Sequence, residues 1–165
     1  ITKSIRHLLN FSRQLHTEKK INNFNDILLK VVSEFKFQAG NKKIKIKKNL
    51  KKDLPSFNFD ESQIEEVVSN IITNAIQAIP KEGEISVKSI FEDNKIVLEI
   101  SDNGNGIPKE NLSKIFLPFY STKEYGKGTG LGLAISKRVV IEHGGQIAVE
   151  SKVGKGTKFK ITFPV

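Results

Sequence analysis

Four segments in the second half of the chain, in which apolar and polar residues alternate, constrain the fold most strongly. They are residues 84–90, 95–101, 146–151 and 157–163. Alternation with a period of two is typical of strands that bury one face, and the Asp-Asn and Gly-rich connections within each pair are typical of hairpins. The sequence therefore predicts two antiparallel hairpins whose apolar face needs a second layer of structure to cover it.

Segments with helical periodicity supply that second layer. The predicted core helices span residues 25–40, 60–79 and 131–142. Asn25 and Asp60 are the expected caps, and Gln63, three residues after Asp60, completes a variant of the capping box. Residues 1–16 form a further predicted helix, whose narrow apolar stripe suits a coiled coil or a bundle. Helices and antiparallel hairpins that segregate along the chain predict an α+β fold, a two-layer α/β sandwich.

The chain of 165 residues is basic, and the position of the charge matters more than its size. It carries 27 Lys and Arg against 18 Asp and Glu, a formal net charge of +9. Residues 1–59 hold 14 of the basic and 4 of the acidic residues, so the remainder is close to neutral. The excess is densest in residues 41–52, where Ile44 and Ile46 alternate with lysines as in a solvated edge strand. This stretch lacks the Arg and aromatic residues typical of nucleic-acid binding, so no nucleic-acid partner is expected.

Composition excludes several other classes of protein. The chain has no Cys, which rules out disulfide frameworks, thiolate zinc sites and cysteine nucleophiles. No apolar run approaches the roughly 20 residues of a membrane span, so we expect no membrane contact by this chain and a cytoplasmic location. The chain also has no Met, which leads us to expect a fragment of a longer protein.

Polar residues at regular spacing on the predicted helix 60–79 suggest chemistry. Glu66, Asn70 and Asn74 are four residues apart, so they form a line that drifts toward the apolar face of the helix. Asn74 lies at the boundary of that face, where an unpaired amide would cost about 1–3 kcal/mol. An amide oxygen in this position is a suitable ligand for Mg²⁺. The alternative is that both asparagines only hydrogen-bond a neighbouring loop.

Two glycine-rich segments indicate a ligand that approaches the backbone closely. Asp102 ends a predicted strand and is followed by Gly104 and Gly106, and an aspartate there can accept a hydrogen bond from an amino group. Residues 126–133 hold a glycine at every second position and open a helix, whose free N–H groups form an anion site. Each segment alone is also typical of an ordinary turn. Together with the line of asparagines they favour a nucleotide pocket.

The order of these motifs resembles the catalytic and ATP-binding domain of sensor histidine kinases, in the GHKL superfamily. The motifs are Asn70…Asn74-Ala75, Asp102-x-Gly104-x-Gly106, Phe116-Leu117-Pro118-Phe119, Gly128-Thr129-Gly130-Leu131-Gly132-Leu133 and Gly154-x-Gly156-Thr157. The resemblance implies a Bergerat fold, with a mixed sheet under three main helices and a preceding N-terminal helix. It also implies that residues 1–20 are a remnant of the second dimerisation and phosphotransfer helix, and that residues 21–165 are the catalytic ATP-binding domain.

The same resemblance implies roles in binding ATP and Mg²⁺. Asn74 would ligate the metal, and Asn70 would make a second polar contact to the metal or the phosphates. Asp102 would receive the adenine amino group, with Gly106 close to the ring and Thr157 at the pocket floor. The candidate cofactor-binding residues are Asn70, Asn74, Asp102, Gly104, Gly106, Ile107, Phe116, Phe119, Lys123, Lys127, Gly128, Thr129, Gly130, Leu131, Gly132 and Thr157.

A lid over the nucleotide, residues 103–129, is a further implication. Phe116 and Phe119 would anchor this lid, unless they simply pack in the core, and its glycines would provide hinges and phosphate contacts. Lys123 lies where short-lid kinases place a phosphate-contacting lysine, and Lys127 is a second candidate. Many relatives have a basic residue where this chain has Gln77, so the lid would carry more of the phosphate contacts. The candidate catalytic residues are Glu66, Asn70 and Lys123.

The phosphoacceptor of the family is a His followed by Glu or Asp and, a few residues on, by Asn-Pro or Thr-Pro. None of His7, His16 and His143 has these neighbours, so each is interpreted as a surface or cap residue. We therefore expect a chain that binds ATP and Mg²⁺ but does not phosphorylate itself. Its expected partners are the protein's own phosphotransfer domain, in a homodimer, and the receiver domain of a response regulator. The alternatives are another GHKL ATPase, such as a topoisomerase, mismatch-repair protein or chaperone, and a non-catalytic nucleotide-binding scaffold.

Overall fold

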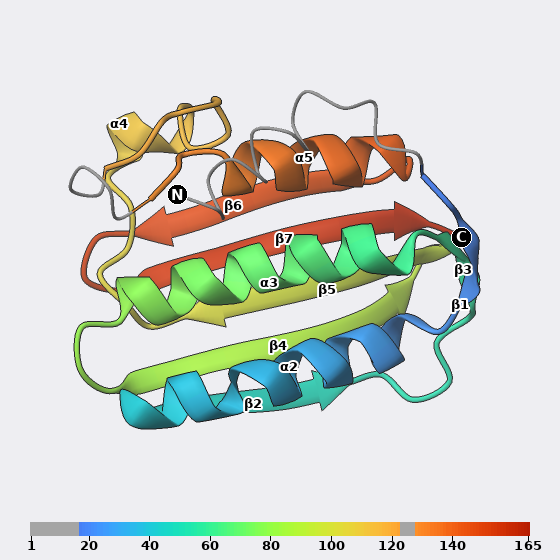
Figure 1. The fold of residues 1–165 in the computed structure, drawn as a ribbon, viewed down its shortest axis with the longest axis horizontal. Coiled ribbons are helices and arrows are strands. Elements are labelled where there is room, and N and C mark those ends of the chain that lie inside the picture. The colour runs from blue at the N-terminus through green and yellow to red at the C-terminus, as the bar shows by residue number, and fades with distance from the viewer. Residues whose placement is uncertain (1–16, 123–127) are drawn as a thin grey trace.

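The computed structural model describes residues 17–122 and 128–165, which form a layer of helices over a five-stranded main sheet. The helices are α2 (Phe24–Asn41), α3 (Glu61–Ala78), α4 (Lys109–Leu112) and α5 (Gly132–Glu142). The strands are β1 (Lys20–Asn22), β2 (Ile44–Leu50), β3 (Phe57–Phe59), β4 (Gly83–Glu92), β5 (Lys95–Asp102), β6 (Gln146–Lys152) and β7 (Gly156–Pro164). Figure 1 shows α2, α3 and α5 side by side over the sheet. The predicted helix in residues 1–16 lies outside the described residues.

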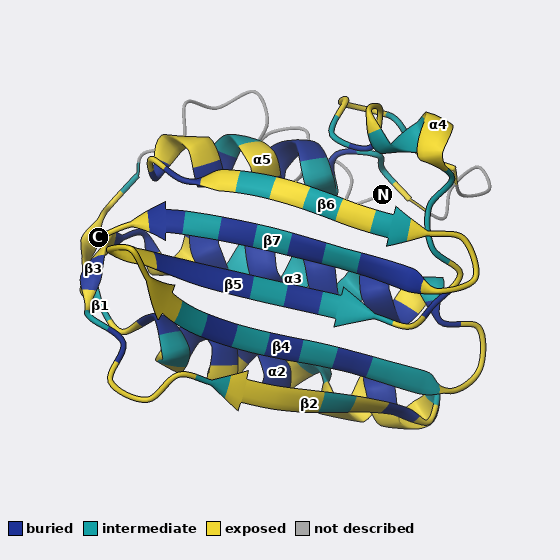
Figure 2. Cartoon of the chain, turned by 180° about the vertical axis from the view of Figure 1, so that it is seen from behind, coloured by how far each residue is buried: buried dark blue, intermediate teal, exposed yellow. Residues whose placement is uncertain are grey.

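The main sheet is mixed, as the resemblance implied. Its strand order is β2-β4-β5-β7-β6, with β2 parallel to β4 and every other neighbouring pair antiparallel. In register across the sheet, Val87 lies beside Ile100, and Ile100 beside Phe159, all buried against the helices. Within the described chain, no helix covers the opposite face of the sheet (Figure 2). The predicted α+β, two-layer sandwich is confirmed.

Helix α3 runs through the centre of the molecule and supplies much of the core. Ile64, Val68 and Ile72 are at most 1% exposed, as expected for the apolar face of the predicted helix. Ile76 is buried as well. Burying side chains of this size stabilises the fold by about 1.5–3 kcal/mol each relative to leaving them in water.

The cap of α3 is only half of the predicted capping box. The Asp60 carboxylate accepts the Gln63 N–H at 3.1 Å, as predicted. The reciprocal contact is absent, because the Gln63 Nε2 donates to Thr17 Oγ1 and the Asp60 N–H donates to His143 Nε2. Burial would raise the pKa of Asp60, but hydrogen bonds from Ser62 and two backbone N–H groups outweigh it and lower the pKa.

The N-cap of α2 differs from the predicted one. Asn23, not Asn25, is the N-cap, and its side-chain oxygen accepts the Asn25 N–H at 2.9 Å. The Asn25 side chain instead contacts the strands, accepting a hydrogen bond from Ser89 Oγ at 2.9 Å and donating one to Lys51 O. Both residues are good caps, and a tertiary contact decides between them.

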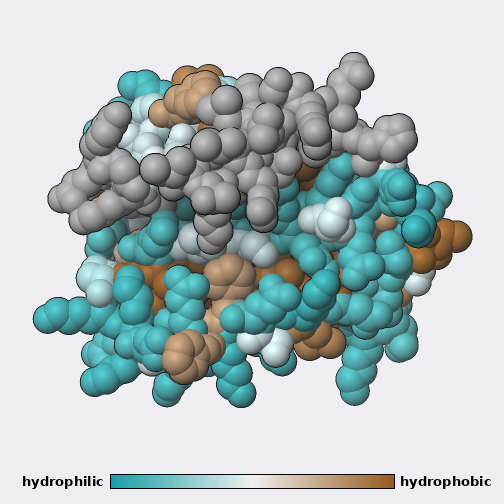
Figure 3. Space-filling model, viewed as in Figure 1, coloured by the Kyte–Doolittle hydropathy of each residue, from teal (hydrophilic) through white to brown (hydrophobic). Residues whose placement is uncertain are grey.

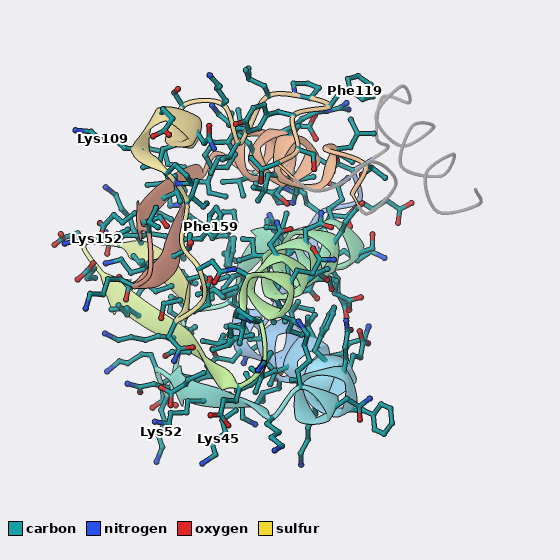
Figure 4. The ribbon with its side chains drawn as sticks, turned by 90° about the vertical axis from the view of Figure 1, so that its left-hand side faces the viewer. Lys45, Lys52, Lys109, Phe119, Lys152 and Phe159 are labelled. Atoms are coloured by element: carbon teal, nitrogen blue, oxygen red, sulfur yellow. The ribbon has the colours of Figure 1, made fainter. Side chains whose placement is uncertain are left out.

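The lysine-rich segment forms β2, which lies at one edge of the sheet, as predicted. Lys45 is exposed there, and Lys47 pairs with Glu84 of the neighbouring strand at 2.7 Å. Figure 4 shows Lys45 and Lys52 at this edge, pointing away from the body of the molecule. Their charge therefore faces solvent.

A second, two-stranded sheet was not predicted. Strand β1 pairs antiparallel with β3, and Glu18, before β1, donates its N–H to Asp60 Oδ2 at 2.8 Å. Contacts with the domain thus begin before residue 21.

Across residues 17–122 and 128–165, no helix has the length and apolar character that a membrane crossing requires.

Candidate functional site

A cavity of about 620 Å³ lies between α3, the start of α5, and the segments that follow β5 and α4. The predicted site residues that line it are Asn70, Asn74, Asp102, Gly106, Ile107, Gly128, Thr129, Gly130, Gly132 and Thr157. Residues far apart in the sequence thus meet around one space. Its volume falls in the range of about 300–1,000 Å³ that small-molecule sites occupy.

Asn70 and Asn74 line the cavity from α3, one helical turn apart. The Asn70 Nδ2 donates to the Gly132 carbonyl at 3.2 Å and contacts Ser136 Oγ at 3.4 Å. The Asn70 NH₂ group therefore makes hydrogen bonds to a neighbouring segment, as the alternative interpretation expected. Both side chains carry an amide oxygen, and both residues line this part of the cavity.

Asp102, at the end of β5, lies beside Thr157 of β7 in the sheet register. Its carboxylate accepts the Gly104 N–H at 2.8 Å and also the Thr157 N–H. Burial raises the pKa of Asp102, and these two hydrogen bonds only partly oppose that rise. Asp102 is half-buried and lines the cavity, and a carboxylate in that position is a strong acceptor for an amino group of a ligand.

The glycines after β5 allow the loop to pack closely against its neighbours. Gly106 has φ of +72°, and a Cβ there would lie 2.2 Å from the Lys152 carbonyl oxygen. A Cβ at Gly104 would lie 2.5 Å from the Ala78 carbonyl oxygen. Gly104 is buried and does not line the cavity, so its requirement comes from packing.

Ser151 was missed by the sequence analysis although it holds two lining residues. Its hydroxyl accepts the Ile107 N–H at 2.8 Å, donates to the Gly156 carbonyl, and lies 2.9 Å from Thr157 Oγ1. A serine in a strand is ordinary composition, so the residue type gives no signal. Its position opposite Thr157 in the hairpin register was the available clue.

The segment before α5 closes against the Phe-Leu-Pro-Phe motif. The Phe119 N–H donates to the Gly130 carbonyl at 2.9 Å, and a Cβ at Gly130 would lie 2.5 Å from the Phe119 carbonyl carbon. The Leu131 N–H donates to Thr129 Oγ1 at 3.3 Å, while the Leu131 side chain is buried in the core. These contacts fix the backbone on both sides of residues 120–129.

The two phenylalanines differ from each other. Phe116 packs edge-on against Phe159 with ring centroids 6.5 Å apart, and Lys137 Nζ lies 5.3 Å from its ring. Phe119 has φ of +65° and a side chain that is 64% exposed. Figure 4 shows Phe119 at the outer edge of the molecule and Phe159 between the layers. Neither Phe116 nor Phe119 lines the cavity, so a lid anchored by Phe119 depends on its backbone, not its ring.

Three other candidates are not placed at the cavity. Glu66 lies one turn before Asn70 on α3 and is not among the lining residues. Lys123 and Lys127 lie outside the described residues. The cavity also has lining residues that the sequence analysis did not select, among them Thr73, Asn105, Asn111, Ile115, Tyr120 and Leu133.

The described lining is nearly neutral. Asp102 is its only charged residue, and it contains no Lys, Arg or His within residues 17–122 and 128–165. The same residues contain no cluster of three or more His, Cys, Asp or Glu side chains that would hold a metal without help. The amide oxygens of Asn70 and Asn74 suit Mg²⁺, which usually shares its shell with water and substrate phosphates. The donor set therefore fits a magnesium ion that arrives with a phosphorylated ligand.

Known proteins share this sequence pattern. Residues 59–165 match the family described as histidine kinase-, DNA gyrase B-, and HSP90-like ATPase. Sporulation kinase C of Bacillus subtilis is 42% identical over 147 residues, covering 88% of this chain and 34% of that protein. The sensor histidine kinase ZraS of Salmonella typhimurium is 31% identical over 166 residues, covering 100% of this chain and 35% of its own length. The chain thus spans about a third of the length of these curated relatives.

Solved structures share the fold. The catalytic domain of histidine kinase ThkA has a TM-score of 0.80 at 30% identity, covering 89% of this chain and 95% of that one. ThkA in complex with the response regulator protein TrrA has a TM-score of 0.83 at 26% identity, covering 99% and 46%. The chain therefore belongs to the family of histidine kinase-, DNA gyrase B- and HSP90-like ATPases, and the domain it forms is the ATP-binding domain of a sensor histidine kinase.

Proposed function

We propose that the cavity binds ATP with Mg²⁺ and presents the γ-phosphoryl group for transfer to a histidine. The observation that carries this proposal is the distribution of chemistry along α3. Gly104 and the neighbouring Asp102 lie against Ala78, whereas Gly132 lies against Asn70, eight residues earlier. Eight residues correspond to about 12 Å along a helix. One cavity thus has a half-buried carboxylate at one end and a helix N-terminus with two asparagine side chains at the other.

The carboxylate end suits the adenine base. Asp102 would accept a hydrogen bond from the exocyclic amino group, while Ile107 and Phe159 supply apolar surface to the ring. Thr157 and Ser151 would hold this floor in shape through their hydrogen bonds. Gly106 also lines this end of the cavity, where its backbone packs against the Lys152 carbonyl.

The opposite end suits the triphosphate. The first N–H groups of α5 have no partners within the helix and favour a negative ligand. Asn74 and Asn70 would hold Mg²⁺ or its bound waters through their oxygens, and the ion, when bound, would neutralise phosphate charge. Because the described lining lacks a cation, we assign Lys123 and Lys127 as the remaining phosphate contacts.

The proposed reaction moves one phosphoryl group. A histidine nitrogen attacks the γ-phosphorus in line with the leaving oxygen, the bond to that oxygen breaks, and ADP leaves. His143 is a poor acceptor because it is buried, with Nε2 accepting the Asp60 N–H at 3.0 Å and Nδ1 lying 2.8 Å from Val139 O. We therefore place the acceptor in the dimerisation and phosphotransfer domain. We assign to that domain the residues before Thr17, because Glu18 and Lys20 already pair with the catalytic domain. The complex of ThkA with TrrA supports a response regulator as the next recipient.

Nucleotide titration tests the binding step. The chain is titrated with ATP in the presence of Mg²⁺ and in EDTA, alongside an Asn74→Ala variant. We expect Mg²⁺ to strengthen binding to the parent and to have a smaller effect on Asn74→Ala. Equal affinity of the parent for ATP with and without the metal would contradict the proposed magnesium site.

Radiolabelled ATP tests the transfer step. The chain alone should acquire no stoichiometric acid-labile phosphate, whereas adding the acceptor domain of the full-length protein should give labelled acceptor. Stoichiometric labelling of the isolated chain would show that one of its own histidines is the acceptor.

A further inference from the structure

A fully buried hydroxyl lies behind the cavity wall, between α3 and α5. Ser136 is 0% exposed, and its Oγ donates to the Gly132 carbonyl, one turn earlier in α5, at 2.9 Å. The Asn70 Nδ2 reaches both groups, at 3.2 Å from the Gly132 oxygen and 3.4 Å from Ser136 Oγ. Ser136 itself does not line the cavity. The two helices lie next to each other in Figure 1, so this contact joins them directly.

This arrangement determines which end of the Asn70 amide faces the ligand. The oxygen and the NH₂ group of an asparagine have nearly the same shape, so packing alone does not distinguish them. Helix α5 presents two acceptors to Asn70, since the Ser136 proton is already given to Gly132 O. Only the NH₂ end can satisfy two acceptors, and the oxygen is left for the cavity.

The freed oxygen lies at the helix N-terminus. A Cβ at Gly132 would lie 3.4 Å from Asn70 Oδ1, so the oxygen sits close to the first residue of α5. Both residues line the cavity there. A cation needs this oxygen, because the NH₂ group of an amide does not ligate a metal and repels it.

We propose that Ser136 is a positioning residue that holds the oxygen of Asn70 toward the cavity and thereby sets how strongly Mg²⁺ enhances nucleotide binding. This inference rests on the proposed function. A serine in a helix commonly donates to the carbonyl four residues earlier, and that role alone affects only the stability of the helix. Only the positioning role predicts that a change at Ser136 alters how strongly Mg²⁺ enhances ATP binding, so this measurement separates it from a purely structural role.

The test compares variants that remove or keep the hydroxyl. Ser136→Ala removes it, and Ser136→Cys replaces it with a weak hydrogen-bonding group of similar size, which guards against a loss of folding. Ser136→Thr keeps the hydroxyl. Ser89→Ala is the matched control, because Ser89 is 3% exposed and its hydroxyl donates to Asn25 Oδ1, away from the cavity.

The readout is the ratio of ATP affinity with Mg²⁺ to ATP affinity in EDTA. Loss of one hydrogen bond predicts that this ratio falls about 2- to 10-fold in Ser136→Ala and Ser136→Cys. Affinity in EDTA should stay close to that of the parent, and Ser136→Thr and Ser89→Ala should keep the parent ratio. In an Asn70→Ala background, Ser136→Ala should cause no further fall, because the two residues act through one amide.

Three results would overturn the inference. The first is a parent-like ratio in both Ser136→Ala and Ser136→Cys. The second is an equal fall in the ratio of Ser89→Ala, which would indicate a general effect of destabilisation. The third is a full additional fall in the Asn70→Ala background. Failure of the parent to bind ATP at all would instead overturn the proposed function, and this inference with it.

Discussion

The Asp102→Asn substitution tests both the chemistry and the energetics of the base end of the cavity. An asparagine has nearly the same size as aspartate, and its oxygen can still accept the Gly104 N–H, which lies 2.8 Å from Asp102 Oδ1. Its NH₂ group would replace an acceptor where the adenine amino group needs one. The substitution therefore removes the charge and one acceptor oxygen while keeping the size of the side chain and the hydrogen bond to Gly104.

The expected loss of affinity follows from the bond that is lost. A hydrogen bond to a charged partner contributes about 1.5–3 kcal/mol. This range corresponds to ATP binding that is about 10- to 150-fold weaker. Affinity for inorganic triphosphate, which makes no contact with Asp102 in the proposed arrangement, should not change.

The stability of Asp102→Asn should change in the opposite direction. Burial raises the pKa of Asp102 in the folded state, so folding favours the protonated carboxyl. The stability that this group contributes is complete below the pKa of the unfolded chain and is lost as the pH rises through the folded pKa. At neutral pH the ionised carboxylate thus costs stability, and Asp102→Asn should unfold at higher urea concentration than the parent. The difference in stability between Asp102→Asn and the parent should shrink toward zero in acid, where the parent carboxyl is protonated as well.

Calorimetric ATP titration and urea unfolding at neutral and acid pH measure the two effects. Glu99→Gln, on the opposite face of the same strand, controls for the loss of one negative charge. The reasoning is refuted if Asp102→Asn binds ATP as tightly as the parent, or if it is less stable than the parent at neutral pH.

Three further predictions concern the scaffold. Gly106→Ala should destabilise the domain by about 1–3 kcal/mol in urea unfolding, since its φ is +72° and a Cβ would lie 2.2 Å from Lys152 O; parent-like stability would refute this. Burial lowers the pKa of His143, so the domain should lose stability as the pH falls below about 6.5, the ordinary pKa of histidine. In thermal melts in acid, His143→Gln should weaken this dependence of stability on pH. Asn23→Ala should lower the free energy of unfolding by about 1 kcal/mol, because it removes the N-cap of α2. Asn25→Ala is the comparison. A melting temperature of Asn23→Ala equal to that of the parent would contradict the prediction.

Much of the architecture could be predicted because periodicity reports burial directly. Alternation in β4, β5 and β7 places Val87, Ile100 and Phe159 on one face, and the structure buries all three. Strand β1 was missed because its three residues are too few to show alternation. His143 was expected at the surface or in a cap; it is the C-cap of α5 but is buried, because the Asp60 N–H approaches it from another element.

The site was predictable to the extent that its chemistry lies in motifs. Asn74, Asp102 and the glycines were selected for their type and spacing, and the structure brings them to one cavity. Ser136 and Ser151 could not be selected, because their importance comes from the partners that folding supplies. Phe119 has a backbone φ of +65° and an exposed ring, and a phenylalanine in the sequence predicts neither feature.

A structure of this chain with a non-hydrolysable ATP analogue and Mg²⁺ tests the central claim most directly. The account predicts the adenine amino group beside the Asp102 carboxylate and the phosphates at the N-terminus of α5, with the metal near the oxygens of Asn70 and Asn74. An analogue bound in the reverse direction, or outside the cavity between α3 and α5, would contradict it.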